Sequence, residues 1–233
     1  MKKLKKILTA LALVLVIAAL VGFAYLYYGG YSGIDHHKSA DEDQIKVACV
    51  GDSITYGHGI TPWYKNNYPK LLGELLGDGY VVNNYGHHGA TLQSSGDQPY
   101  ISYKDYENSI EFEADILVFM LGSNDAKAEN WIDESSFKAE YLTRLKEYRE
   151  GNSDIRIILC TPPTSYRKNS ENPARVEIIA KVVREIAKEE NLQLLDVKEL
   201  TEGREDLYLD DGAHLNNEGA ILLAEWVYSA IAE

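Results

Sequence analysis

Short apolar runs alternate with longer segments of helical periodicity over most of the chain, from residue 45 to residue 233. The runs are rich in Val, Ile and Leu and are bounded by turn residues, a pattern typical of buried strands. They predict five strands, at 45–50, 80–85, 115–121, 155–161 and 192–196. The segments between and after them predict four helices, at 67–77, 134–150, 174–190 and 215–231. Strands that alternate with helices predict an α/β domain with a parallel sheet covered on both faces.

The helical segment at 174–190 has the clearest apolar face. The residues that recur at helical spacing there are Val176, Ile179, Ala180, Val183, Ile186 and Ala187. We expect this face to pack on the sheet. No internal repeat or low-complexity segment interrupts the region, so the sequence predicts one domain over residues 45–233.

The first 28 residues follow a different pattern. Four lysines, at positions 2, 3, 5 and 6, precede an uncharged run that begins at Ile7 and is strongly apolar as far as Tyr28. A helix of this length can cross the roughly 30 Å hydrocarbon core of a bilayer. Lysines before the run place the N-terminus in the cytoplasm and the domain outside. The sequence therefore predicts a single-pass anchor in the cell membrane at 1–28 and an extracellular domain.

A cleaved signal peptide, and thus a secreted protein, is the alternative interpretation of this leader. Gly22 and Ala24 would be the small residues before the cut. The apolar run is longer than a usual signal peptide, and tyrosines crowd the cleavage site, so we favour the anchor. Residues 29–44 are Gly-rich and then charged, without periodicity, and predict a flexible linker.

The exported part of the chain is acidic. The leader holds four of the 23 Lys and Arg residues and none of the 36 Asp and Glu residues, so the remainder is more negative than the net −13 of the whole chain. This charge argues against nucleic acid as a partner. Cys49 and Cys160 both lie in apolar strand-like runs, and we interpret them as small buried hydrophobic residues.

Polar residues follow the predicted strands or precede the last helix at four places: Gly51 to Ser53, Gly86 to Thr91, Leu121 to Asp125, and Asp210 to His214. Ligands bind at the carboxyl ends of the strands in an open α/β sheet. Acyl transfer needs a nucleophile, a base, a group that orients the base, and donors for the oxyanion. Each of these needs has a candidate among the four places, and we expect all four places to lie on the same edge of the sheet.

These four blocks, in this order, resemble those of the SGNH (GDSL-type) hydrolases over nearly the whole region after Ile45. The resemblance implies a flavodoxin-like three-layer sandwich with a central parallel five-stranded sheet, and no metal or other cofactor. It implies that Ser53 is the nucleophile, that His214 is the general base and that Asp211 orients His214. It further implies an oxyanion hole made by the backbone N–H groups of Ser53 and Gly89 and the side-chain amide of Asn124. Asp210 is the alternative orienting acid.

Within this superfamily the chain is most similar to the sialate-O-acetylesterase-like branch. The residues that carry this likeness are Leu121 to Lys127, Asn130-Trp131, Gly77 to Asn83, and Gly96 to Tyr100. The chain departs from the branch at His87-His88, which stands where a small residue is usual. Neighbouring residues on an extended segment point in opposite directions, so a two-histidine metal site is not expected there.

Four residues on the expected loops are candidates for substrate contacts. Trp63, Tyr100 and Trp131 offer rings on which sugars stack, and Lys127 offers a cation for a polar or acidic substituent. The alternative for the aromatic residues is that they anchor their loops to the domain.

The resemblance implies a serine esterase that removes small acyl groups, above all O-acetyl groups, from a carbohydrate. A lysophospholipase or thioesterase acting on lipid esters is one alternative, although the loops show no long apolar stretch for an acyl groove. A carbohydrate-binding relative without activity is another, and the presence of Ser53, Asp211, His214 and Asn124 argues against it. Acetyl transfer to a second sugar uses the same residues and stays open.

Overall fold

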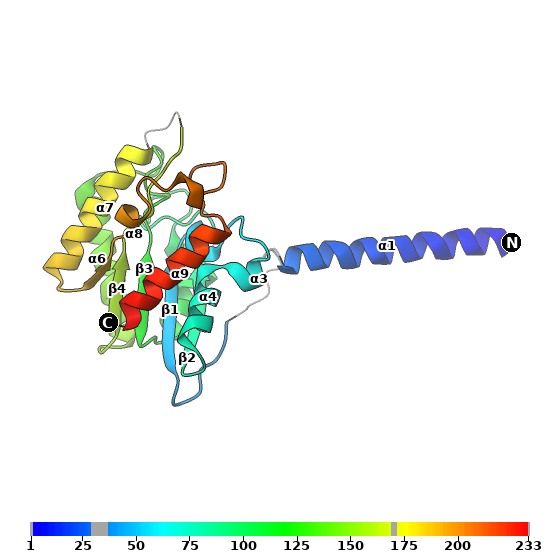
Figure 1. Cartoon of the computed structure of the whole chain (residues 1–233), viewed down its shortest axis with the longest axis horizontal. Coiled ribbons are helices and arrows are strands. Elements are labelled where there is room, and N and C mark those ends of the chain that lie inside the picture. The colour runs from blue at the N-terminus through cyan, green and yellow to red at the C-terminus, as the bar shows by residue number, and fades with distance from the viewer. Residues whose placement is uncertain (1, 29–36, 169–171, 233) are drawn as a thin grey trace.

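The computed structural model describes residues 2–28, 37–168 and 172–232. Its centre is a five-stranded sheet in the order β2-β1-β3-β4-β5, in which every neighbouring pair is parallel (Figure 1). The strands are β1 Ile45–Gly51, β2 Tyr80–Gly86, β3 Ile116–Met120, β4 Arg156–Cys160 and β5 Gln193–Leu195. This strand order is the flavodoxin-like order. The fold predicted for the chain is confirmed.

Four long helices cover the sheet and correspond to the four that were predicted. They are α4 Tyr68–Leu76, α6 Glu134–Gly151, α7 Asn172–Glu189 and α9 Asn217–Ala232. The structure adds shorter helices, α2 Ser53–Tyr56, α3 Trp63–Asn66, α5 Lys104–Glu111 and α8 Val197–Leu200, and two 3₁₀ turns, η1 Tyr100–Ser102 and η2 Glu205–Leu207. Most of these span about one turn, too short to show an apolar period.

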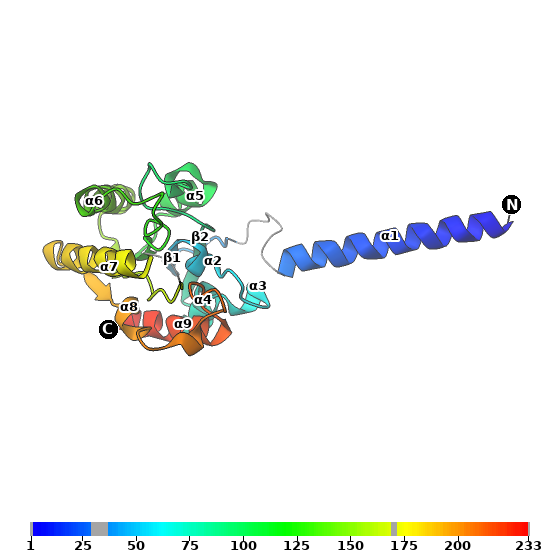
Figure 2. The ribbon, with the colours of Figure 1, turned by 90° about the horizontal axis from the view of Figure 1, so that it is seen from above.

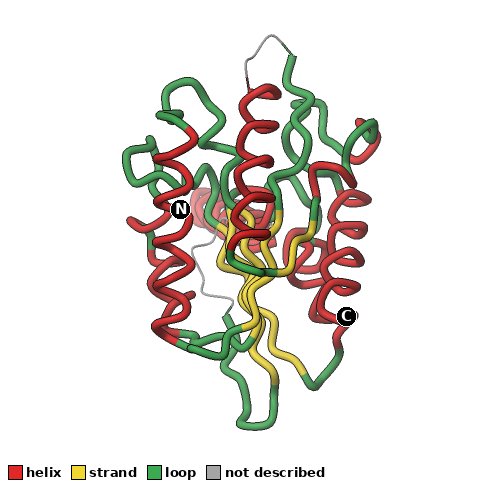
Figure 3. Tube along the Cα trace, turned by 90° about the vertical axis from the view of Figure 1, so that its left-hand side faces the viewer, coloured by secondary structure: helices red, strands yellow, loops and turns green. Residues whose placement is uncertain are grey.

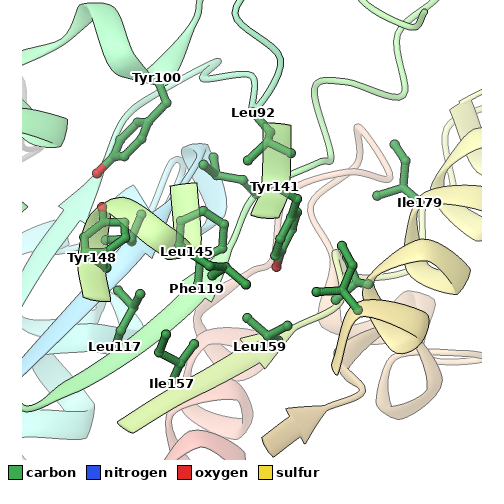
Figure 4. Close-up of a cluster of buried hydrophobic side chains, with 14 of the residues drawn as sticks. Leu92, Tyr100, Leu117, Phe119, Tyr141, Leu145, Tyr148, Ile157, Leu159 and Ile179 are labelled. Atoms are coloured by element: carbon green, nitrogen blue, oxygen red, sulfur yellow. The ribbon is translucent and has the colours of Figure 1, made fainter. Parts of the chain in front are cut away.

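Alternate residues of each central strand face opposite helical layers. In β3, Leu117 and Phe119 pack with α6 and α7, whereas Val118 and Met120 pack with α4 and α9. Figures 2 and 3 show the sheet between these two layers, and Figure 4 shows the cluster on the α6–α7 side. A strand that is buried on both faces must be apolar at every position, and all five residues of β3 are buried.

Two details of the core agree with the sequence. The predicted face of α7 is buried, with exposures from 0% at Ile179 to 3% at Ala187. Cys49 and Cys160 are buried, free and part of the same hydrophobic cluster. Burial raises the pKa of the Cys49 thiol to about 12, so both cysteines serve as packing residues.

The leader forms helix α1, Lys2–Tyr28, over the range expected for the anchor. The stretch Lys5–Ala24 is long and apolar enough to cross a membrane, and none of it is buried against the protein. A membrane anchor and a signal sequence can both have this length and composition, so these two properties do not distinguish them.

Part of the predicted flexible linker is attached to the domain. Residues 29–36 lie outside the described part of the chain, but His37 and Lys38 lie against the edge strand β2. His37 Nε2 is 2.8 Å from the Asn84 carbonyl oxygen, and Asn83 exchanges two hydrogen bonds with the backbone of Lys38. The described part of the predicted linker thus contacts the domain, which its composition did not reveal, because the partner of the backbone at residue 38 is the distant Asn83.

Candidate active site

The turn after β1 places Ser53 at the start of a helix at the carboxyl edge of the sheet. Asp52 is the N-cap of α2, and its Oδ1 accepts the Ile54 N–H at 2.9 Å. Burial raises the pKa of this carboxyl, and the hydrogen bond from Ile54 opposes the rise. Asp52 therefore stabilises the start of the helix that carries Ser53. Ser53 itself is 5% exposed.

Ser53, His214 and Asp211 form a continuous chain of hydrogen bonds. His214 Nε2 lies 2.9 Å from Ser53 Oγ, although the two residues are 161 positions apart. On the other side of the ring, His214 Nδ1 lies 2.5 Å from Asp211 Oδ2. The described structure thus brings together the three residues expected to form a triad.

Asp211 is held in a turn that orients its carboxylate. Its Oδ1 accepts the backbone N–H of Ala213 at 2.9 Å and that of His214 at 3.0 Å. Partial burial would raise the pKa of Asp211, but these hydrogen bonds and the imidazole outweigh it and lower the pKa to about 2. The carboxylate is therefore ionised at neutral pH and can stabilise a protonated His214.

The two other expected oxyanion donors lie on adjacent loops. The Asn124 side-chain amide donates to the Ala90 carbonyl at 3.1 Å, which ties the loop after β3 to the loop that carries Gly89. Asn124 is 9% exposed and lines the same pocket as Ser53. Gly89 has a φ of 80°, and a Cβ there would lie 2.6 Å from the Gln98 amide nitrogen. Only glycine fits this position without strain.

Asp125, to which the sequence gave no role, fixes the backbone of the Gly89 loop. Its two carboxylate oxygens accept the N–H groups of Leu92 at 2.9 Å and Gln93 at 2.8 Å. Burial raises the pKa of Asp125 to about 7, although these two hydrogen bonds lower it in part. Asn124 and Asp125 together connect the loop after β3 to the loop after β2.

The pocket in front of Ser53 also includes residues that carry no motif. Lys127 borders it, as expected for a substrate contact, and its Nζ lies 3.6 Å from Asp97 Oδ2. Arg167, Thr164 and Ser165 also line the pocket and come from the loop after β4. Nothing in the sequence distinguishes this loop, since it has neither periodicity nor a recognisable block.

Of the aromatic residues expected to contact substrate, Tyr100 belongs to the core. It lies in the buried cluster drawn in Figure 4 and is 1% exposed. Its hydroxyl donates to the Tyr85 carbonyl at 2.6 Å. Trp63 is 7% exposed and its indole N–H donates to the Tyr56 carbonyl. Trp131 is half-buried and packs near Phe137. Tyr100 is thus too deeply buried to contact a sugar. The contacts of Trp63 and Trp131 agree with the alternative that these residues anchor their loops, because burial of an aromatic ring in the core is more favourable than its exposure to water.

Two further histidines lie beside His214. The ring centroid of His58 is 4.4 Å from that of His214 and 4.4 Å from that of His88. Within residues 2–28, 37–168 and 172–232, no three His, Cys, Asp or Glu side chains are grouped so that they could hold a metal ion. The sequence singled out His88 as a departure from the family pattern but gave no sign of His58.

A flavodoxin-like sheet with a hydrogen-bonded Ser, His and Asp at its carboxyl edge defines a class, the serine-dependent ester hydrolases. Residues 49–221 match the GDSL-like Lipase/Acylhydrolase family, and the chain belongs to this family of ester hydrolases. The predicted membership of the SGNH superfamily is confirmed.

An acetylxylan esterase of Xylanibacter ruminicola is 34% identical over 209 residues. The match covers 82% of this chain but only 44% of that protein, so the chain spans less than half of its relative's length.

Solved structures show the same fold. A lipase/acylhydrolase from Enterococcus faecalis superposes with a TM-score of 0.66 at 24% identity, covering 81% of this chain and 95% of that one. A carbohydrate acetylesterase from Sinorhizobium meliloti superposes with a TM-score of 0.66 at 17% identity, covering 81% and 99%.

Asn124→Ala should reduce kcat by about 10²–10³-fold, or roughly 3–4 kcal/mol in the barrier, with little change in KM. As the expected oxyanion donor, the amide would meet negative charge that exists only in the transition state, so substrate binding should be spared. Steady-state kinetics on an aryl acetate will measure both constants. A variant whose defect lay mainly in KM would contradict this role for Asn124.

Proposed function

We propose that this protein is an extracellular serine esterase that removes O-acetyl groups from carbohydrate through a covalent acyl-enzyme. The observation that carries the proposal is the hydrogen-bonded chain from Asp211 through His214 to Ser53. The acetylxylan esterase relative supports an acetylated carbohydrate as the substrate class.

In the first half of the proposed reaction, Ser53 Oγ attacks the ester carbonyl carbon while His214 Nε2 takes the hydroxyl proton. The distance of 2.9 Å between these atoms suits that transfer. The tetrahedral intermediate then collapses, the bond to the sugar oxygen breaks, and His214 gives its proton to that oxygen. The sugar leaves as an alcohol and Ser53 carries the acetyl group.

In the second half, water attacks the acyl-enzyme and His214 takes a proton from it. The ester bond to Ser53 breaks, the proton returns to Ser53 Oγ, and acetate leaves. Asp211 holds its carboxylate toward Nδ1 in both halves and stabilises the imidazolium that forms each time. A sugar hydroxyl in place of the water would give acetyl transfer by the same steps.

The oxyanion of both intermediates is proposed to lie between the backbone N–H groups of Ser53 and Gly89 and the amide of Asn124. One amide hydrogen of Asn124 is used in the bond to Ala90, which leaves the second for the oxyanion. This arrangement would fix a donor in place before the charge develops.

Acyl-chain length provides the experiment that tests the substrate class. Polar and charged side chains, among them Ser123, Lys127 and Arg167, line much of the pocket around Ser53. A methylene group gains about 0.8 kcal/mol only where an apolar wall buries it, and a polar pocket offers little such wall. Rates should therefore fall for acyl chains longer than about four carbons. Aryl esters from acetyl to octanoyl should give a maximum at acetyl.

The same enzyme should release acetate from acetylated xylan and related glycans. A maximum at octanoyl, together with no acetate release, would assign the protein to lipid esters instead. Faster loss of acetyl ester with added sugar than in water alone would indicate acetyl transfer.

We further propose that α1 anchors the catalytic domain at the outer face of the cell membrane. The support is an apolar stretch of 20 residues, Lys5–Ala24, preceded by lysines. Full-length protein should remain with membranes through a carbonate wash, whereas a chain starting at Gln44 should be soluble. Recovery of soluble natural protein whose first residue lies just after Ala24 would contradict the anchor and support a signal peptide.

A further inference from the structure

Three imidazole rings from three separate loops pack against one another beside Ser53. We refer to His58, His88 and His214 as the histidine stack. The ring of His58 lies in the middle, 4.4 Å from His88 with 20° between the planes and 4.4 Å from His214 with 51° between the planes. The outer rings, His88 and His214, are 6.2 Å apart. His58 is thus the link between the other two.

Each of the three loops also carries one part of the proposed machinery. His58 follows α2, the short helix that begins at Ser53. His88 directly precedes Gly89, and His214 is the proposed base. The stack therefore connects the loops of the nucleophile, of one oxyanion donor and of the base, and two of its three side chains, His58 and His88, lie outside the triad.

The backbone around His58 is built to hold its ring in this place. The N–H groups of Gly57 and His58 both donate to the Ser53 carbonyl, at 3.0 Å and 2.9 Å. Gly57 and Gly59, on either side of His58, have φ values of 92° and 78°, which favour glycine. A Cβ at position 59 would lie 2.3 Å from Leu209 Cδ1, so the two loops approach closely there.

One hydrogen bond connects Leu209, which lies close to Gly59, with His214. The N–H of Leu209 donates to the His214 carbonyl at 2.8 Å. The loop of the nucleophile and the loop of the base are therefore packed together at the backbone as well as at the rings.

The two additional rings are kept uncharged. Burial lowers the pKa of His58, and the neighbouring His214 lowers it further while Asp211 opposes the change. Partial burial of the ring also lowers the pKa of His88 to about 4, and the neighbouring His58, His214, His87 and Lys127 add to the effect. The charged and titratable groups facing these two rings are His214, Asp211, His87 and Lys127. Two neutral rings can pack on a base that becomes cationic during the reaction without repelling it as cations would.

We propose that His58 and His88 are positioning residues that hold the His214 imidazole toward Ser53 and keep the three loops in one arrangement. This inference rests on the proposed function. Asp211 fixes the ring from one edge only, and its own side chain is 43% exposed. Hydrogen bonds at the two ring nitrogens, to Asp211 and to Ser53, leave the ring free to rotate about the line that joins them, and contact with the face of the ring restricts that rotation. Displacing a reacting group by about 1 Å can cost about 10²-fold in rate.

The test compares His58→Ala, His88→Ala and His58→Phe, with His87→Ala as the matched control. His87 neighbours His88 in sequence but lies 2.7 Å from Asp105 and stacks on Tyr103, outside the histidine stack. We expect His58→Ala to lower kcat on an aryl acetate by about 10-fold to 10²-fold, with KM changed by less than about twofold. His88→Ala should have a smaller effect in the same direction, because His88 reaches His214 through His58. His87→Ala should leave kcat unchanged.

A second readout follows the base without any substrate. Phosphonylation of Ser53 by a fluorophosphonate needs the same proton transfer to His214, so its rate should fall in parallel with kcat. His58→Phe keeps a ring of similar shape, and we expect it to recover most of both rates. Its acid limb of kcat/KM against pH should match that of the unaltered protein, since a neutral ring replaces a neutral ring.

Several outcomes would overturn the proposal. His58→Ala with unchanged kcat would show that the contact does not matter. A folded His58→Phe as slow as His58→Ala, or with a shifted acid limb, would show that a ring nitrogen or charge acts rather than packing. Should His58→Ala unfold, His58→Phe alone decides between these results. Ser53→Ala in the same assay separates the two proposals: if it stays active, the proposed function fails, and if it is inactive while both stack variants are unaffected, only the stack fails.

Discussion

Ser53→Ala should abolish ester hydrolysis, with kcat lowered by about 10⁶-fold in the manner of other serine hydrolases. The substitution removes Oγ, the proposed acceptor of the acyl group, which lies 2.9 Å from the proposed base. The substitution removes a single oxygen atom from the side chain, so the fold should be retained. The measurement is kcat on an aryl acetate with purified enzyme, together with acetate release from acetylated xylan.

The control for this variant is its thermal unfolding midpoint, which should be close to that of the unaltered protein. Electrospray mass spectrometry adds a direct test. The unaltered protein, quenched in acid during turnover, should carry one acetyl group on the peptide containing Ser53, and Ser53→Ala should carry none. Substantial remaining activity in a folded Ser53→Ala would disprove the covalent mechanism.

Asp211→Asn should lower kcat by about 10⁴-fold while KM and the fold stay nearly unchanged. The reason lies in the turn that holds the side chain. Two backbone N–H groups, from Ala213 and His214, require an acceptor at Oδ1. The amide NH₂ of Asn must then face His214 Nδ1, which forces the proton of the neutral ring onto Nε2. Such a ring cannot accept the proton of Ser53.

Asp210→Asn is the matched control, because Asp210 precedes Asp211 in the same loop and is exposed to solvent. It should change kcat only slightly. The pH dependence gives a further check on Asp211. Its pKa is lowered to about 2, so its contribution to folding is fully present above the unfolded value of about 3.9 and is lost as the pH falls toward 2. If Asp210→Asn were the slower variant, the assignment of the orienting acid would be wrong.

The features of this protein that could be predicted from its sequence are those that depend on interactions between residues close together in the chain. The strands and long helices depend on periodic apolar residues close together in the chain, so β3 and the buried face of α7 were readable directly. The pairing of Asp211 with His214 was implied by the family resemblance, and their spacing of three positions allows a turn to bring the two side chains within reach. Ser53 was recognisable by its place after β1 and by its likeness to a known block.

Exposure of single side chains could not be read in the same way. Tyr100 is polar at one end and sits in a loop region, yet its hydroxyl finds the carbonyl of Tyr85 and its ring enters the core. Lys38 belongs to a stretch without periodicity, yet its backbone binds Asn83 on β2. In both cases the partner is distant or unmarked in sequence, and burial depends on which segments fold over one another.

The sequence alone determined the sheet, its helical layers, the family and the place of the nucleophile, because each depends on local periodicity or on a short block of residues. Only the tertiary structure decided the surroundings of the base. His58 and His214 are 156 positions apart and share no motif, but the fold brings the loop after α2 and the loop before α9 to one edge of the sheet. The contact between their rings arises from that topology, which no spacing along the chain reveals.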